Sequence, residues 1–220
     1  MRESVMFYGI KDHQKGKCFL MGLDAIKAQI EYIESMFVEI DTEYIADVII
    51  IRKESDIRIG AGVSLTLIGR ESIHIEPGVI VRSVGAEGKS GSDDSRGHCT
   101  TNTDRDGGGV GDGQVGYSGT SAGNFIICTT HLEFEQDMER FFHVALVGGK
   151  GGAGGKGGKG GLFWLNLVES AENRRAVEKI SPPILTGGEA ANRGSDDDGE
   201  HKITFSSTFS DVMKRLTDEG

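Results

Sequence analysis

Proline, cysteine and aromatic side chains are all scarce in this sequence. Its 220 residues include three prolines, which is too few for a collagen-like triple helix. The three cysteines, Cys18, Cys99 and Cys128, form neither a disulfide framework nor a CxxC metal-binding pair. A single tryptophan and an aromatic content of 7% leave no evident platform on which sugar rings would stack. These shortages exclude the collagen-like and disulfide-stapled classes.

Positive charge and long apolar runs are scarce as well. The chain has 24 Lys and Arg against 34 Asp and Glu, a formal charge of -10, which argues against a nucleic-acid partner. Residues 1–17 contain no apolar core of a signal peptide, and the longest aliphatic run is 48–51. We therefore expect no signal peptide and no membrane insertion. The compartment stays unassigned, with a virion or an extracellular assembly as the expectation, because such assemblies also include proteins without a signal peptide.

Glycine is the residue in excess. Of 34 glycines, 12 fall in 85–123 and 10 in 148–161. This composition divides the chain into an expected N-terminal helix and β-solenoid-like layer over 1–84, and a glycine-rich body with a short C-terminal helix over 85–220.

Hydrophobic periodicity changes along the first region. Between Leu23 and Phe37 the apolar residues recur every three or four positions, which predicts a short amphipathic helix. From Phe37 to Val81 short alternating β-branched segments follow one another every seven to ten residues, separated by glycines. The connections are too short for crossover helices, so a hairpin meander and a parallel β-solenoid are both open. The segment IGAGVSLTLIGRESIHIEPGVIVRS resembles the coils of right-handed parallel β-helix proteins, and this resemblance favours the solenoid.

Glycine pairs repeat with a period of three in the second region. Residues 148–161 read GGKGGAGGKGGKGG, and the same phase recurs in 85–97, in 107–122 and after Leu185. A polyproline-II helix has three residues per turn, so the intervening side chains would line one edge and leave two edges bare for contact with neighbouring backbones. Flexible linkers are the alternative interpretation. Apolar strand-like segments bracket each glycine string, which favours ordered polyglycine-II packing.

This succession of strand, glycine string and strand resembles the glycine-rich polyglycine-II bundles of phage tail-fibre tip adhesins. The resemblance lies in the order and spacing of the repeats over about residues 85–200, and no binding motif is matched. It implies a mainly β fold in which strands alternate with polyglycine-II strings.

Several short motifs have the outline of chemical sites but lack the required context. A GxGxxG pattern at 111–116 and a Walker-like segment at 83–90 lack the strand and helix on either side that nucleotide-binding loops need. The GTSAG segment at 119–123 leads into a strand-like run instead of the helix of a nucleophile elbow. The acidic run 102–107 resembles the start of an EF-hand, but Gly113 occupies the position of the bidentate carboxylate. We therefore assign no catalytic, cofactor-binding or metal-binding residues, and leave open whether the acidic loops bind Ca²⁺.

The sequence predicts a non-enzymatic structural protein that assembles with itself into a homo-oligomer or filament. Bare glycine edges and exposed ends of a solenoid both call for partners, and one chain of this length supplies few. The alternative is a viral or phage-type adhesin, or another surface-binding module, with a surface glycan or protein receptor as its partner. An enzyme would need clustered acids and bases, and no such constellation is evident.

Overall fold

The computed structural model describes residues 10–11, 18–19, 29–89, 117–135, 142–152, 156–188 and 198–219. The described elements are as follows: β1 (Ile10–Lys11), β2 (Cys18–Phe19), β3 (Ile30–Ile33), β4 (Met36–Val38), β5 (Thr42–Ile51), β6 (Asp56–Ile59), β7 (Ser64–Ile75), β8 (Ile80–Val84), β9 (Asn124–Phe134), β10 (His143–Val147), β11 (Leu162–Val168), α1 (Ala171–Glu178), β12 (Glu200–Ser206) and α2 (Phe209–Glu219). The protein is therefore mainly β, as its sequence predicts.

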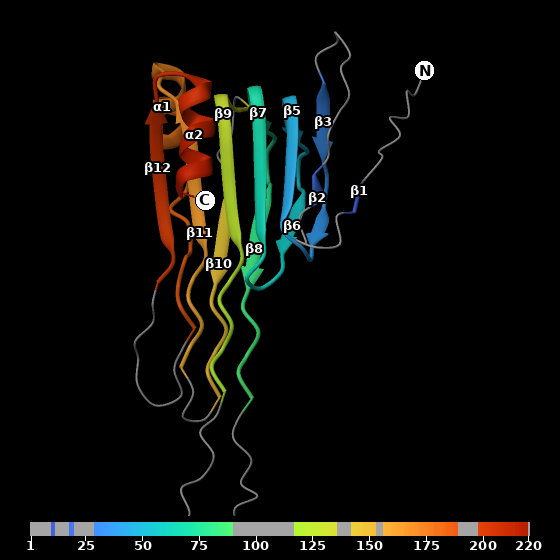
Figure 1. Cartoon of the computed structure of the whole chain (residues 1–220), viewed down its shortest axis with the longest axis vertical. Coiled ribbons are helices and arrows are strands. Elements are labelled where there is room, and N and C mark those ends of the chain that lie inside the picture. The colour runs from blue at the N-terminus through green and yellow to red at the C-terminus, as the bar shows by residue number, and fades with distance from the viewer. Residues whose placement is uncertain are drawn as a thin grey trace, which may run out of the picture.

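The strands form two sheets that lie face to face (Figure 1). The larger sheet has the order β1-β2-β5-β7-β9-β11-β12, with β3 also pairing with β5, and the smaller has the order β10-β8-β6-β4. Apart from the β1–β2 pair, every strand pairing in the described part of the chain is parallel. This pattern excludes the hairpin meander, because consecutive strands of a hairpin are antiparallel.

The chain alternates between the two sheets. It passes from β5 to β6, from β7 to β8 and from β9 to β10, and each return adds a strand next to the preceding one. After β11 the smaller sheet receives only an isolated bridge between Ile184 and Ala145 before the chain returns as β12. Each passage therefore extends both sheets in the same direction, until the smaller sheet ends one strand earlier than the larger.

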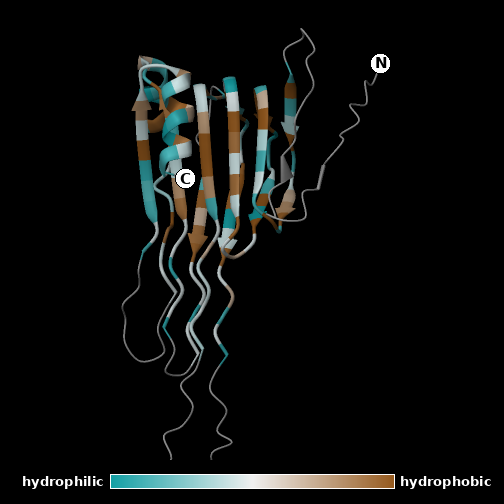
Figure 2. Cartoon of the chain, in the orientation of Figure 1, coloured by the Kyte–Doolittle hydropathy of each residue, from teal (hydrophilic) through white to brown (hydrophobic). Residues whose placement is uncertain are grey.

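Alternating side chains build the core between the sheets. The largest fully buried side chains there include Phe125, Phe142 and Phe163, with aliphatic residues of both sheets around them. Phe125 stacks on Phe163 with ring centroids 5.9 Å apart, and Phe142 meets Phe163 edge-on. Brown apolar segments mark the strands in Figure 2, whereas the glycine strings are pale.

The predicted helix at 23–37 is wrong where the structure describes it. Residues Ile30–Ile33 form β3 and Met36–Val38 form β4, and these strands pair with β5 and β6. Periodicity in a short apolar segment fits a helix and a strand almost equally well. The exposed edges of β5 and β6 offer backbone partners, and these long-range hydrogen bonds decide the conformation. Residues 23–28 lie outside the described part of the chain.

The short alternating segments expected between Phe37 and Val81 include 63–68 and 72–76, and the structure joins these two in one strand, β7. Its pairing with β9 shifts register between Gly69 and Ser72, which marks a bulge. A Cβ added at Gly69 would lie 2.5 Å from the backbone oxygen of Ser72. The glycine that looked like a break between strands is therefore the residue that permits the bulge within one strand.

Two helices lie outside the sheets. The predicted C-terminal helix is present as α2, whereas α1 was not foreseen. Ser170 caps α1 by accepting a hydrogen bond from the backbone N–H of Asn173 at 3.0 Å, and this Ser-x-x-Asn spacing was the available signal. Asn173 is itself buried and donates to the carbonyls of Thr130 and Val168, which fixes α1 against the end of the larger sheet.

The regions 1–84 and 85–220 share both sheets. Strand β7 pairs with β9, and β8 pairs with β10, across this division. No helix in the described part of the chain combines the length and apolar character needed to cross a membrane.

Candidate functional site

Glycine strings extend from one end of the two sheets and lie side by side (Figure 1). The strings comprise residues 85–89, 117–123, 148–152, 156–161, 185–188 and 198–199. Those numbered 85–89, 148–152 and 185–188 continue from β8, β10 and the Ile184 bridge, and the other three lead into β9, β11 and β12. The strings therefore prolong both layers of the sheet body.

Backbone hydrogen bonds connect each string to strings from both layers. Within one layer, Gly88 donates its N–H to the carbonyl of Lys150 at 2.7 Å, and Gly119 donates to Lys156 at 2.8 Å. Between layers, Gly149 donates to Thr120 at 2.9 Å, and Gly158 donates to the carbonyl of Gly149 at 2.8 Å. The described glycine strings are therefore an ordered bundle, and the linker interpretation does not hold for them.

The donors repeat every third residue. Gly149 and Gly152 donate to the string 117–123, while Gly158 and Gly161 donate to the segment that contains Leu146 and Gly149. A backbone with three residues per turn presents equivalent groups to the same neighbour at this interval. The period of the sequence is thus the period of the inter-string bonds.

Side chains are excluded from the interior of the bundle. A Cβ added at Gly149 would overlap the carbonyl oxygen of Ala86, and one at Gly158 would overlap that of Thr120. A Cβ at Gly157 would overlap the carbonyl oxygen of Gly188. Glycine is required at these positions because neighbouring backbones approach too closely for any side chain.

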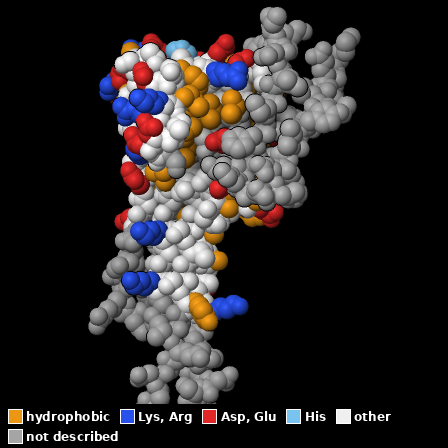
Figure 3. Space-filling view, viewed as in Figure 1, with side chains coloured by type: hydrophobic (Ala, Val, Ile, Leu, Met, Phe, Trp, Pro, Cys, Tyr) orange, Lys and Arg blue, Asp and Glu red, His pale blue; other side chains and the backbone are white. Residues whose placement is uncertain are grey.

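The side chains between the glycines point outward. Lys150, Lys156 and Lys159 are exposed, as the triplet period predicts. Figure 3 shows the bundle as a mostly uncharged surface with a few Lys and Arg groups, below a sheet body on which both charge signs are mixed. These three lysines therefore form an exposed basic edge of the bundle, in which Lys150 and Lys159 also interact with other groups of the chain.

The second candidate region lies in the sheet body, where α2 packs beside β12, the last strand of the larger sheet. Thr208 caps α2, since its hydroxyl accepts from the N–H of Asp211 at 3.2 Å and donates to the carboxylate of Asp211 at 2.8 Å. The apolar side of α2 packs on the outer face of the sheet, where Val212 is fully buried with Trp164.

A buried polar network holds α2 on the sheet. Trp164 Nε1 donates to Thr204 Oγ1 at 3.0 Å, and Thr204 Oγ1 donates to Asn166 Oδ1 at 2.9 Å. Asn166 Nδ2 then donates to the carbonyl of Val212 at 2.8 Å. The neighbouring Cys128 thiol has its pKa raised to about 12, chiefly by burial, so it stays protonated at neutral pH.

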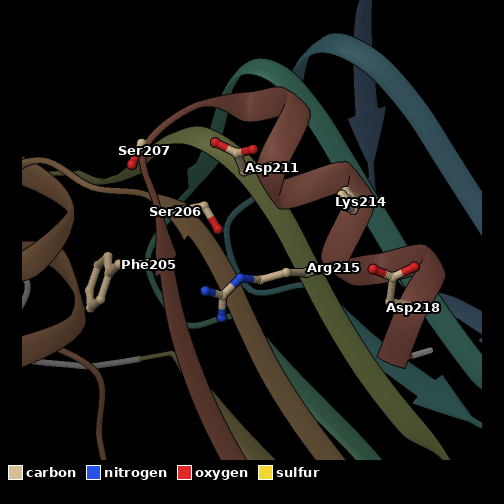
Figure 4. A pocket seen from close by; sticks show the side chains of 7 residues that line it. All are labelled: Phe205, Ser206, Ser207, Asp211, Lys214, Arg215 and Asp218. Atoms are coloured by element: carbon tan, nitrogen blue, oxygen red, sulfur yellow. The ribbon is translucent and has the colours of Figure 1, made fainter.

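An open groove of about 340 Å³ lies between the end of β12 and α2 (Figure 4). The side chains that line it are Phe205, Ser206, Ser207, Asp211, Lys214, Arg215 and Asp218. Ser206 Oγ is buried and has no hydrogen-bond partner in the described structure, and the Ser206 side chain points toward the guanidinium of Arg215. The sequence did not indicate that the charged residues of α2 would lie beside the end of β12.

Of the short motifs singled out in the sequence, the GTSAG segment lies within the described residues. Ser121 of the GTSAG segment lies exposed in a glycine string that enters β9, so no nucleophile elbow is formed. The GxGxxG pattern, the acidic run 102–107 and Ser90 lie outside the described residues. Within the described ranges, no three His, Cys, Asp or Glu side chains are grouped so as to hold a metal ion.

Charged side chains on the outer face of the smaller sheet are bound to one another. Asp56 accepts hydrogen bonds from Arg82 at 2.5 Å and from Arg58 at 2.9 Å. The hydrogen bond from Arg82 is the largest cause that lowers the pKa of Asp56. The side chain is therefore a stable carboxylate at neutral pH and forms part of an ion-pair cluster.

Comparison with known proteins gives no relative for this chain. No protein-family model, curated protein or solved structure matches it.

Proposed function

We propose that this protein is a non-enzymatic structural protein that assembles with copies of itself into a homo-oligomer or filament. The observation that carries the proposal is the free edge of β12, beyond which no further described strand pairs. Strand β4 occupies the corresponding place at the other end of the smaller sheet. Unpaired strand edges present rows of backbone donors and acceptors that bind further strands.

In finer terms, we take the two parallel sheets to be a short β-solenoid and the glycine strings to be polyglycine-II helices. The alternation of the chain between the sheets supports the first interpretation. The three-residue period of the inter-string hydrogen bonds supports the second.

The bundle changes one premise of this proposal. The sequence suggested that bare glycine edges would need strings from other copies, yet the described strings bond to one another within a single chain. The case for assembly therefore rests on the sheets, whose ends are open, and on the exposed apolar side chains there. Phe37 on β4 is 61% exposed, and Ile184, which continues the smaller sheet, is 57% exposed.

Sedimentation-velocity ultracentrifugation over a wide concentration range, with negative-stain microscopy of the same samples, tests the proposal. We expect species larger than one chain that increase with concentration. A monodisperse monomer at about 100 μM, far above the affinity range of stable complexes, would refute self-assembly.

The bundle itself favours a second candidate, a surface-binding module of the adhesin type. A set of internally bonded strings that projects from one end of the sheets provides a rigid stalk (Figure 1). Binding of the labelled full-length chain to a glycan array and to intact cells tests this candidate. Saturable binding by a monomeric protein would favour it over self-assembly, and the absence of binding to either would count against it.

A further inference from the structure

The free edge of β12 exposes a defined set of backbone groups. Glu200 donates its N–H to Gly161 on the β11 side, and the carbonyl of Ser206 accepts from Glu169 on the same side. Because alternate residues of a strand direct their N–H and C=O to the same side, residues 200, 202, 204 and 206 bond toward β11. The N–H and C=O groups of His201, Ile203 and Phe205 therefore point to the open edge.

The apolar core is also open at this edge. His201, Ile203 and Phe205 belong to the side of β12 that faces the core, where His201 stacks on Phe163. The smaller sheet contributes only the bridge at Ile184 at this end, so no described strand lies opposite β12. Ile203 is consequently 37% exposed and Phe205 is only partly buried. A partner at this edge would remove apolar surface from water as well as pair backbone groups.

The side of α2 that faces β12 across the groove carries both charge signs. Lys214, Arg215 and Asp218 line the groove beside Ser206, and Arg215 also interacts electrostatically with Glu219 of the same helix. A surface that carries both charge signs can be complementary to a copy of itself turned by 180°.

We infer that two copies of the chain join through their β12 strands, antiparallel, about a twofold axis at Ile203. In this arrangement Ile203 pairs with Ile203 of the second copy, and His201 pairs with Phe205 in both directions. Each of these is a hydrogen-bonded pair, because all three residues direct their backbone groups to the edge. The larger sheets of the two copies become one continuous sheet.

The positions of the charges agree with this axis. Glu219 of α2 is bound to Lys202 of β12, which fixes the level of the helix against the strand. A helix rises about 1.5 Å per residue and a strand about 3.3 Å, so Arg215 lies near the level of residue 204 and Asp218 near the level of 202–203. Rotation about Ile203 exchanges these levels, and Arg215 of each copy then meets Asp218 of the other across the two grooves.

This inference rests on the proposed self-assembly and specifies its interface. Ile203→Pro tests it, because proline lacks the N–H that faces the second copy while the bonds to β11 from residues 202 and 204 remain. Ile203→Val is the matched control that keeps the N–H. By sedimentation velocity we expect the wild type and Ile203→Val to be dimers and Ile203→Pro to be a monomer with an unchanged circular-dichroism spectrum.

A charge exchange provides a second test that does not alter the strand. Arg215→Asp should weaken the dimer about tenfold or more, since it brings like charges together across the axis. The double variant Arg215→Asp with Asp218→Arg restores the complementarity and should recover the dimer. If the single and double variants assemble like the wild type, the inferred interface is wrong.

A cross-link separates failure of this interface from failure of the proposed function. Residues in a hydrogen-bonded antiparallel pair have Cα atoms about 5.5 Å apart, within disulfide range, so Ile203→Cys should form a covalent dimer on oxidation. Phe37→Cys at the far edge and the wild type serve as controls and should not. If only the Phe37→Cys variant cross-links, the protein assembles with itself but not through β12. If the wild type is a monomer, both the proposed self-assembly and the β12 interface are wrong.

Discussion

The sheet body and the glycine bundle solve the same packing problem in opposite ways. In the body, interlocking side chains such as Phe125 and Phe163 fill the space between two backbone layers. In the bundle, backbones such as those of Gly149 and Gly158 touch directly, and the lysine side chains between the glycines lie on the outside. The body should therefore be sensitive to the removal of atoms, and the bundle to their addition.

The largest expected effect is the loss of a core side chain from the body. Phe125→Ala removes a fully buried ring that contacts Phe142 and Phe163. We expect a loss of about 3–5 kcal/mol in the free energy of unfolding, because a cavity remains where the ring was. Urea denaturation followed by circular dichroism measures it. A loss below about 1 kcal/mol would show that the rings do not pack as described.

The next effect concerns the only polar network described between α2 and the sheet. Asn166→Ala removes the acceptor of the Thr204 hydroxyl and the side-chain donor to the carbonyl of Val212, while Thr204 still accepts from Trp164. Leaving the buried Thr204 hydroxyl without an acceptor costs about 1–3 kcal/mol, so we expect the free energy of unfolding to fall by about 2 kcal/mol. Hydrogen exchange of α2 amides should also accelerate. Slow exchange that equals the wild type would contradict the role of this network.

Adding a single methyl group tests the bundle. Gly158→Ala should destabilise the strings by about 1–3 kcal/mol, because the new Cβ overlaps the backbone of Thr120. Lys156→Ala, two residues before it, removes a much larger exposed side chain from the outer edge and should change stability by less than about 0.5 kcal/mol. Hydrogen exchange of the string amides compares the two variants. If the string amides exchange equally in both variants, the strings are flexible linkers and not a packed bundle.

The smallest effect is electrostatic. The pKa of Asp56 is lowered in the folded state, so its contribution is present at pH values above its unfolded pKa, about 3.9. That contribution is lost as the pH falls through the lower folded pKa. For a partly exposed cluster we expect about 0.5 kcal/mol. Urea denaturation at pH 7 and at pH 2 measures how much the free energy of unfolding falls on acidification. In Asp56→Asn this fall should be smaller by about 0.5 kcal/mol. If the fall equals that of the wild type, other carboxylates cause it.

Local patterns predicted most of the strands and the bundle. Alternating residues located β6, and the apolar segments that bracket the glycine strings lie where β9 and β11 are found. The triplet period predicted which glycine positions would be interior and that the lysines between them would point outward. These features were readable because the pattern and the structural period coincide within a few residues. The interpretation of β7 as two strands was wrong, because glycine is typical both of a turn between strands and of a bulge within one strand, and Gly69 lies at a bulge.

The sequence by itself determined the mainly β class, the ordered glycine strings and the acidic, cysteine-poor surface, because composition and short periodicities carry that information. Only the tertiary structure decided that residues Ile30–Ile33 and Met36–Val38 are strands, that the strings find their partners within one chain, and that Arg215 and Asp218 line a groove beside β12. Each of these depends on hydrogen bonds or charges between residues far apart in sequence, which no local pattern encodes.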